Sequence, residues 1–190
     1  MPTEAKTEPI RIGTERLLLS PLQIADSQAL LAYRSNPAVG GFLTWKPKNL
    51  EEVEEYIRTA NSITPNTPET WYQLGIRLKD SGLLIGDMGV HFFGPQNQQT
   101  ELGYAIALEH QRKGYASEAI KAVIDFLFGI YRKHRITASA DPGNKASIQL
   151  LQKLGMRQEA HHIKSFWIDG EWTDDIVFAI LREEWAQKNA

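Results

Sequence analysis

One apolar pattern between residues 116 and 131 limits the folds open to this chain more than any other feature. Apolar residues there recur at steps of three and four, which is the spacing of one face of an α-helix. Because a helix with a single apolar stripe must bury that stripe, we expect this helix to lie on a sheet. The positions that form the stripe are Ala116, Ala119, Ile120, Val123, Ile124, Leu127, Phe128 and Tyr131.

The residues before this helix have the period of strands. Residues 71–78 alternate apolar and more polar side chains, which predicts a strand. The turn "KDSG" then leads into a returning strand over residues 83–93, and a third strand is predicted at residues 100–108 after the turn "GPQNQQ". The short connections indicate an antiparallel meander of these three strands.

The first part of the chain predicts one strand and two helices. Residues 16–22 have the pattern of a strand, and Asp26 is expected to cap a helix that closes before Pro37. Asn49 is expected to cap a second helix, whose apolar residues recur at helical spacing up to Ala60.

The last part of the chain continues the alternation of strands and helices. "HRITASA" predicts a short strand, and "NKASIQLLQKLG" predicts a short helix that ends at Gly155. Residues 156–181 predict a hairpin with "DG" as its turn. The chain is therefore expected to be mixed α/β with one continuous sheet, in a single domain over residues 10–190 after a disordered lead-in at residues 1–9.

Composition excludes several classes of function. The 190 residues carry a net charge of -2, which argues against a general nucleic-acid-binding protein. No apolar run approaches the length of a membrane span, and the first residues lack the apolar core of a signal peptide. The chain has no cysteine, so it forms no disulfide, no thiolate metal site and no thioester on its own side chain. We expect a cytoplasmic protein without a metal ion, and without nucleic-acid or membrane partners.

A basic turn stands directly before the long helix, in the stretch "EHQRKGYASEA". The N-terminus of a helix already carries partial positive charge, so Arg112 and Lys113 are unfavourable there unless an anion binds. Gly114 lets a ligand approach the backbone closely, while Glu118 partly offsets the positive end. The stretch is either a cradle for a phosphate or pyrophosphate, or a solvated basic turn.

The same stretch resembles a known family. "QRKGYA" matches the Q/R-x-x-G-x-G/A signature of the GCN5-related N-acetyltransferase (GNAT) superfamily, and "ADPGNKASIQLLQKLGM" is similar to its later asparagine-containing segment. "TERLLLSPL" and "GEWTDDIVFAILREEW" resemble the ribosomal-protein N-terminal acetyltransferase (RimJ/RimL-like) branch. The resemblance covers residues 10–185. It implies the GNAT fold, in which helices flank both faces of one mixed, largely antiparallel, splayed sheet.

The resemblance implies direct transfer of an acetyl group from acetyl-CoA to an amine. The leading hypothesis for the acceptor is a protein or peptide N-terminal amine, such as that of a ribosomal protein. One alternative is a small amine: a polyamine, an amino sugar or an amino-acid derivative. Another is a non-catalytic protein that senses acyl-CoA. By analogy with the family, a homodimer could form through the exposed edge of the splayed sheet, and the sequence does not decide whether it does.

The resemblance assigns cofactor contacts to three segments. The signature loop is expected to direct its amides at the pyrophosphate, and the strand before it is expected to carry a bulge that exposes its backbone to the pantetheine arm, with one N–H as oxyanion donor. Asn144 is expected to contact the arm, and it is equally suited to cap the helix that follows. The residues of the loop and strand are Gln111, Arg112, Lys113, Gly114, Tyr115 and Ala116, and Ala105, Ile106 and Ala107.

The resemblance also assigns the proton transfers. Glu101 corresponds to a glutamate that deprotonates the amine through water, and a water chain is an alternative base. Many relatives protonate the thiolate with a tyrosine, but Leu151 occupies that position here. Ser147, one turn earlier, is the proposed donor or else a small residue packed near the cofactor. Tyr104 and Tyr115 are weaker substitutes.

Acceptor contacts are expected from aromatic and acidic side chains. The tryptophans at 45, 71, 167 and 172 belong either to the core or to the wall of an acceptor slot, and we expect Trp45 and Trp172, together with Glu101, to contact the acceptor. The acidic residues of the last hairpin either form a solvated turn or attract a cationic acceptor. The histidines at 161 and 162 point to opposite faces of a strand and are not expected to share a metal.

Overall fold

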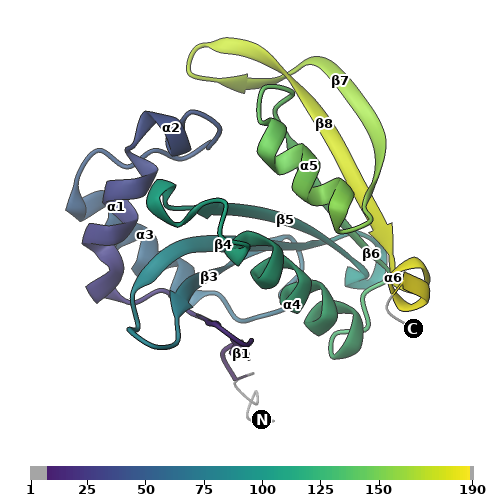
Figure 1. Ribbon diagram of the computed structural model, residues 1–190, viewed down its shortest axis with the longest axis horizontal. Coiled ribbons are helices and arrows are strands. Elements are labelled where there is room, and N and C mark those ends of the chain that lie inside the picture. The colour runs from purple at the N-terminus through teal and green to yellow at the C-terminus, as the bar shows by residue number, and fades with distance from the viewer. Residues whose placement is uncertain (1–7, 189–190) are drawn as a thin grey trace, which may run out of the picture.

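One eight-stranded sheet organises the protein, in the order β1-β2-β3-β4-β5-β6-β8-β7 (Figure 1). The computed structural model describes residues 8–188, so residues 1–7 of the predicted lead-in lie outside the described residues. All neighbouring strands are antiparallel except β5 and β6, which are parallel. The strands are β1 (Ile12–Gly13), β2 (Leu17–Ser20), β3 (Thr70–Leu78), β4 (Leu84–Phe93), β5 (Gln99–Ile106), β6 (Arg135–Ala140), β7 (Arg157–Ile168) and β8 (Glu171–Leu181).

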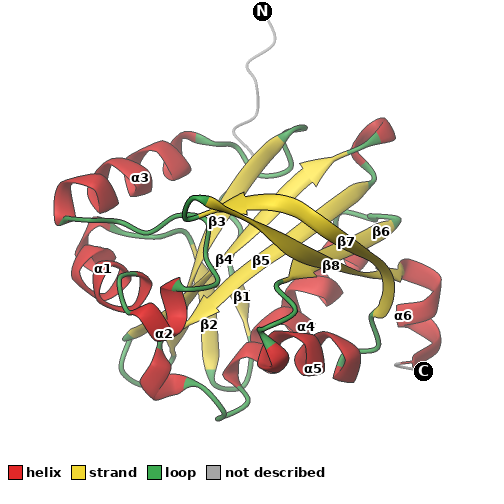
Figure 2. Ribbon diagram, turned by 90° about the horizontal axis from the view of Figure 1, so that it is seen from above, coloured by secondary structure: helices red, strands yellow, loops and turns green. Residues whose placement is uncertain are grey.

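Helices cover both faces of the sheet (Figure 2). One face packs on α4 and α5 in the larger core, and the other packs on α1, α2 and α3 in a second core. The predicted fold class, a mixed and largely antiparallel sheet with helices on both faces, is confirmed. The helices are α1 (Ser27–Arg34), α2 (Pro37–Gly40), α3 (Leu50–Ser62), α4 (Tyr115–Gly129), α5 (Lys145–Lys153) and α6 (Arg182–Lys188), and there are short 3-10 turns at Ile24–Asp26, Pro95–Asn97 and Leu108–His110. No helix in this described part is both long and apolar enough to cross a membrane.

The periodic patterns place the main elements correctly. The stripe predicted from residue 116 onwards forms the buried side of α4, although Tyr131 lies beyond its end. β3, β4 and β5 form the predicted meander, and Asn49 caps α3 by accepting a hydrogen bond from the backbone N–H of Glu52 at 2.9 Å. The last hairpin turns at Asp169 and Gly170, whose φ angles of 52° and 87° suit that turn pair.

Asp26 precedes α1 as predicted, but its side chain does not cap the helix. The carboxylate instead accepts a hydrogen bond from the backbone N–H of Gln23 at 2.6 Å and forms a buried ion pair with Arg77. A buried guanidinium is a stronger hydrogen-bond partner for a carboxylate than the backbone N–H groups at the start of a helix. The carboxylate of Asp26 therefore pairs with Arg77 and does not cap α1. β1, α2 and α6 were not predicted, because they are too short to show a period in the sequence.

β5 and β6 are the strands that shape the functional site. They pair only from Gln99 to Glu101 on β5, against Arg135 to Thr137 on β6. Beyond Glu101 the two strands diverge, while β5 stays paired with β4 as far as Ile106. The sheet is therefore splayed at its centre, as the resemblance implies.

Candidate active site

The splayed part of β5 turns one backbone edge to the gap, where the carbonyl of Ile106 accepts a hydrogen bond from the side chain of Gln111 at 2.9 Å. Pairing with β4 has an unbroken register from Gln99 to Ile106, so the predicted bulge in this strand is absent. Ala107 donates its N–H to the carbonyl of Ile85 at 2.9 Å, and alternation along the ladder directs the N–H of Ala105 to β4 as well. Of the three predicted residues, only Ile106 therefore points its N–H into the gap, where β6 has moved away.

The N-terminus of α4 forms a cradle of unpaired amides. The backbone N–H of Gln111 donates a hydrogen bond to the carbonyl of Leu108. The backbone N–H groups of residues 112–117 meet no acceptor in the part of the chain that the structure describes. Arg112 and Gly114 have φ angles of 58° and 84°, which turn consecutive amides towards one side. Backbone amides in such a nest, at a helix N-terminus, bind anions.

Contacts from the turn between β1 and β2 hold this cradle in shape. The carboxylate of Glu118 accepts hydrogen bonds from the hydroxyl of Thr14 at 2.5 Å and from the Nε of Arg16 at 2.7 Å. Burial alone would raise the pKa of Glu118, but these hydrogen bonds outweigh it and lower the pKa. Arg16 also donates to the carbonyl of Lys113 at 3.1 Å and stacks on the ring of Tyr115. Glu118 is thus occupied by Arg16 and Thr14, and the cradle stays positive.

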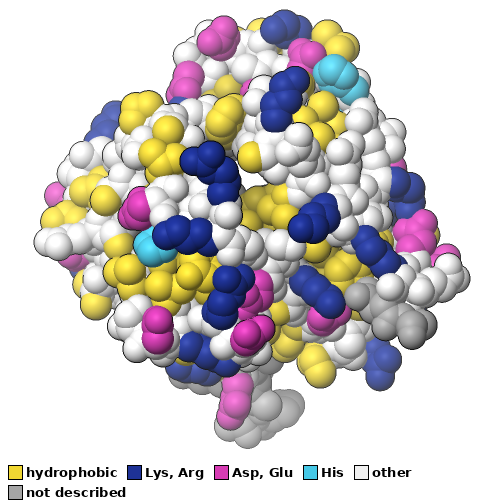
Figure 3. Space-filling view, in the orientation of Figure 1, with side chains coloured by type: hydrophobic (Ala, Val, Ile, Leu, Met, Phe, Trp, Pro, Cys, Tyr) yellow, Lys and Arg dark blue, Asp and Glu magenta, His cyan; other side chains and the backbone are white. Residues whose placement is uncertain are grey.

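The space-filling view in Figure 3 shows the surface around this cradle. A hollow with an apolar floor lies near the middle of the face that carries α4 and α5, and Lys and Arg side chains stand around it. Such a surface suits a ligand with an apolar or neutral arm and a strongly anionic end.

Two hydroxyls meet on the α5 side of the gap. Tyr104 of β5 and Ser147 of α5 approach with their oxygens 2.8 Å apart. Burial raises the pKa of Tyr104 to about 12, so this phenol keeps its proton at neutral pH. Asn144 accepts a hydrogen bond from the backbone N–H of Ser147 at 3.1 Å, which is the helix-cap role predicted for it. Leu151 is fully buried in the core and offers no proton.

Two carboxylates lie on the opposite face of the gap. Strand alternation places Glu101 of β5 and Asp175 of β8 on the face that α1, α2 and α3 partly cover. Burial raises the pKa of Glu101, His91 on the neighbouring strand opposes this, and the charge of Asp175 adds to it. Burial also raises the pKa of Asp175, against a hydrogen bond from Ser139. A carboxylate with a raised pKa is a stronger base than a solvated one.

Of the predicted acceptor residues, Trp45 and Trp172 lie in different surroundings. Trp45 stacks on Tyr56 with ring centroids 4.0 Å apart, and its carbonyl accepts a hydrogen bond from Arg34. It is therefore partly buried, on the same face of the sheet as Glu101. Trp172 is 54% exposed, and alternation along β8 turns it to the α5 side, away from Asp175.

Asp175 and His91 were not predicted to act on Glu101. Asp175 appeared only as one residue of an acidic turn, and His91 carried no signal. His91 is the register partner of Glu101 on β4, and the charge of Asp175 on β8 acts on Glu101, so both relations depend on how distant strands assemble. In the described range 8–188, no three His, Cys, Asp or Glu side chains are grouped as a metal site would need.

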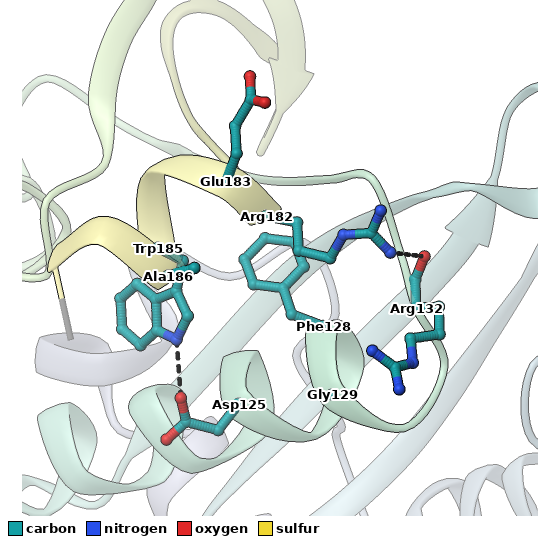
Figure 4. Close-up of a pocket in the computed structure, with 8 residues that line it drawn as sticks. All are labelled: Asp125, Phe128, Gly129, Arg132, Arg182, Glu183, Trp185 and Ala186. Carbon is teal, nitrogen blue, oxygen red and sulfur yellow. Dashed lines mark hydrogen bonds between the residues drawn. The ribbon is translucent and has the colours of Figure 1, made fainter. Parts of the chain in front are cut away.

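A separate pocket lies at the other end of α4 and contains none of these residues (Figure 4). It is bounded by the last turn of α4 and by α6, where the indole of Trp185 donates to Asp125 at 2.7 Å and Arg182 donates to the carbonyl of Arg132. These contacts fasten α6 onto α4.

Comparison with known proteins gives a consistent result. A family model described as an acetyltransferase (GNAT) domain matches residues 16–157. The "uncharacterized N-acetyltransferase YnaD" of Bacillus subtilis (strain 168) is 30% identical over 177 residues, which are 93% of this chain and 99% of YnaD. The [ribosomal protein uS5]-alanine N-acetyltransferase of Escherichia coli (strain K12) is 37% identical over 84 residues, which are 44% of this chain and 43% of that protein.

Solved structures share the fold. The acetyltransferase (GNAT family) from Bacillus anthracis superposes with a TM-score of 0.81 at 27% identity, covering 92% of this chain and 100% of that one. The ribosomal-protein-S5-alanine acetyltransferase from Vibrio fischeri gives a TM-score of 0.75 at 21% identity, covering 93% and 98%, and this likeness concerns the fold alone.

Proposed function

The chain belongs to the GNAT acetyltransferase family and is an N-acetyltransferase, and from this we propose that it transfers the acetyl group of acetyl-CoA to the N-terminal amine of a protein or peptide. The observation that carries the proposal is the gap between β5 and β6. It has a carboxylate on one face, paired hydroxyls on the other, and a free backbone N–H between them.

The residues present fit acetyl-CoA as the cosubstrate. The unpaired amides of residues 112–117 and the side chains of Arg112 and Lys113 would hold the pyrophosphate. The open edge of β5 would pair with the amides of the pantetheine arm, with Asn144 nearby. When bound, acetyl-CoA supplies an activated acyl group as a thioester.

Glu101 and Ile106 would act on the acceptor side of the reaction. Glu101 takes a proton from the acceptor ammonium, directly or through water, which frees the nitrogen lone pair. A C–N bond then forms as the C–S bond breaks, and the N–H of Ile106 stabilises the negative charge that develops on the carbonyl oxygen. Asp175 adds negative charge on the same face, which favours a cationic acceptor.

Ser147 and Tyr104 would complete the proton balance on the other side. Ser147 donates its proton to the departing thiolate, and Tyr104 replaces that proton through their hydrogen bond. The acceptor nitrogen loses its second proton to solvent as the amide forms, solvent returns a proton to Tyr104, and the proton taken by Glu101 leaves to solvent, so one proton is released in all. This pair supplies the acid that the leucine at position 151 cannot.

Support for a protein N-terminus comes from relatives whose names state that acceptor. The uS5-alanine N-acetyltransferase matches less than half of this chain, at 44%. The carboxylates beside the gap are compatible with any cationic amine, so the test has to separate peptides from small amines.

The test is release of thiol from acetyl-CoA, followed with a thiol-reactive dye, against peptides with free N-termini, the same peptides with blocked N-termini, polyamines and amino sugars. The protein has no cysteine and adds no background. We expect release with free N-termini only. Release only with a polyamine or an amino sugar would overturn the proposed acceptor, and failure to bind acetyl-CoA would overturn the assignment of the α4 cradle.

A further inference from the structure

A partly exposed indole covers the sheet in the same row as Glu101, with His91 between them. Trp71 of β3 is 40% exposed and belongs to neither core. Its register partner is His91 of β4, which in turn is the partner of Glu101 of β5, so the three side chains form a row on one face. The rings of Trp71 and His91 stack at 4.9 Å with an interplanar angle of 10°, and His91 stacks on Phe93 in the same way.

Two glycines let this indole lie flat across the strands. A Cβ built on Gly89 would lie 2.9 Å from Cε3 of Trp71, and one built on Gly103 would lie 3.8 Å from its Cζ3. Neither glycine has a positive φ, so the backbone does not require glycine at these positions. What the glycines provide is space: the indole reaches from β3 across β4 to β5.

The position of the indole relates it to the acceptor. Gly103 is two residues from Glu101 on the same face of β5, about 7 Å along the strand. An acceptor whose amine is held at Glu101 and whose chain runs towards Gly103 would place the group on its first carbon beside the benzo ring of Trp71. The ring therefore occupies the volume above Gly89 and Gly103 that a side chain of the acceptor would otherwise enter.

We propose that Trp71 sets the size of the acceptor's first residue, so that the enzyme accepts small first side chains and rejects bulky ones. This inference rests on the proposed function. Trp71 acts by excluding volume beside Glu101, and the stack with His91 and Phe93 together with the flat floor at Gly89 and Gly103 keeps the ring in place.

The experiment compares kcat/KM for two peptides that differ only in the first residue, alanine or phenylalanine. We expect the wild-type enzyme to prefer alanine, and Trp71→Ala to reduce this preference by about tenfold or more, through a rise for the phenylalanine peptide. Gly89→Ala keeps the indole but pushes it away from the sheet, and should sharpen the preference for alanine. Ile130→Ala, at an exposed apolar residue beyond α4, should leave the ratio unchanged.

The outcomes separate this inference from the proposed function. If the wild-type enzyme acetylates both peptides and Trp71→Ala leaves their ratio unchanged, the role of Trp71 is wrong and the proposed function stands. A wild-type preference for phenylalanine would also overturn it. If no peptide is acetylated while acetyl-CoA binds, the proposed acceptor fails first, and this inference fails with it. Since Gly89→Ala retains the tryptophan, instability of Trp71→Ala would not leave the question open.

Discussion

At Glu101, burial and a neighbouring carboxylate act on the same group. Burial raises its pKa, so protonation at moderately acid pH removes the base. We expect kcat/KM to fall, as pH decreases, through an apparent pKa above the ~4.3 of a free glutamate. Glu101→Gln should lower kcat by about 10²- to 10⁴-fold and abolish this limb, leaving only the titration of the acceptor amine near ~8. A pH profile of Glu101→Gln with the wild-type acid limb would contradict the assignment.

The hydroxyl pair of Ser147 and Tyr104 makes a second prediction for single residues. Ser147→Ala should lower kcat by about 10²-fold without changing the affinity for acetyl-CoA, because the thiolate loses its immediate proton donor. Tyr104→Phe should cost less, since water can recharge the serine. Pre-steady-state rates and equilibrium binding separate the two quantities. An unchanged kcat in Ser147→Ala would return the serine to a packing role.

The sequence predicts which residues belong to this site better than it predicts which residues they contact. Asn144 and Ser147 follow from a local motif, and the structure adds the hydrogen bonds that such a motif cannot specify. The selection of Ile106 among three candidate donors required the ladder between β4 and β5. The effect of Asp175 on the pKa of Glu101 could not be predicted, because it depends on the order of the strands in the sheet.

At the scale of elements, the N-terminus of α4 depends on one left-handed glycine. Gly114 has φ of 84°, and a Cβ there would meet Nη2 of Arg16 at 3.3 Å. Gly114→Ala should cost about 1–2 kcal/mol of folding free energy, because the backbone is left-handed there, and should weaken acetyl-CoA binding, because the strain disturbs the amides of the cradle. Gly129→Ala, in the last turn of the same helix with open space around it, is the matched control and should do neither. Denaturant unfolding and titration with acetyl-CoA measure both effects, and equal behaviour of the two variants would contradict the cradle.

Long elements were predictable because their periods repeat. α4 and the strands of the meander extend over many residues, so one face appears several times in the sequence. β1, α2 and α6 are too short for this. The side chain of Asp26 was misassigned because its partner, Arg77, lies 51 residues away.

At the scale of the whole molecule, one buried lysine makes stability depend on pH. Lys133 is 1% exposed, donates to the carbonyl of Asn97 and lies over the ring of Phe92, and burial lowers its pKa to about 8. The folded state therefore binds fewer protons than the unfolded state between about pH 8 and the lysine's ordinary pKa of ~10.4, and stability should rise with pH over that window. Below about pH 8 the lysine is charged in both states, and the cost of burying that charge lowers the stability of the folded state by a constant amount.

Lys133→Met tests this dependence, because methionine fills a similar volume without a charge. The slope of unfolding free energy against pH, at most about 1.4 kcal/mol per pH unit for one proton, should disappear in the variant between pH 8 and 10. Lys121→Met, at an exposed residue of α4, should keep the slope. If the slope persists in Lys133→Met, other titrating groups cause the pH dependence of the stability.

The architecture as a whole was predictable in element order and in fold class, and not in the geometry of the gap. The point at which β5 leaves β6 depends on strands separated by α4, and on the β8 strand that pairs with β6 from the other side. The gap that opens between the two strands connects the face of the sheet that carries Glu101 with the face that carries Ser147.

Tandem mass spectrometry of one peptide, after incubation with the enzyme and acetyl-CoA, shows directly which amine the enzyme acetylates. The peptide carries a free N-terminus with alanine first and one internal lysine. We expect an acetyl group on the α-amine with the wild-type enzyme, and none with Glu101→Gln over the same time. Acetylation of the lysine alone, or no acetylation by an enzyme that binds acetyl-CoA, would contradict it.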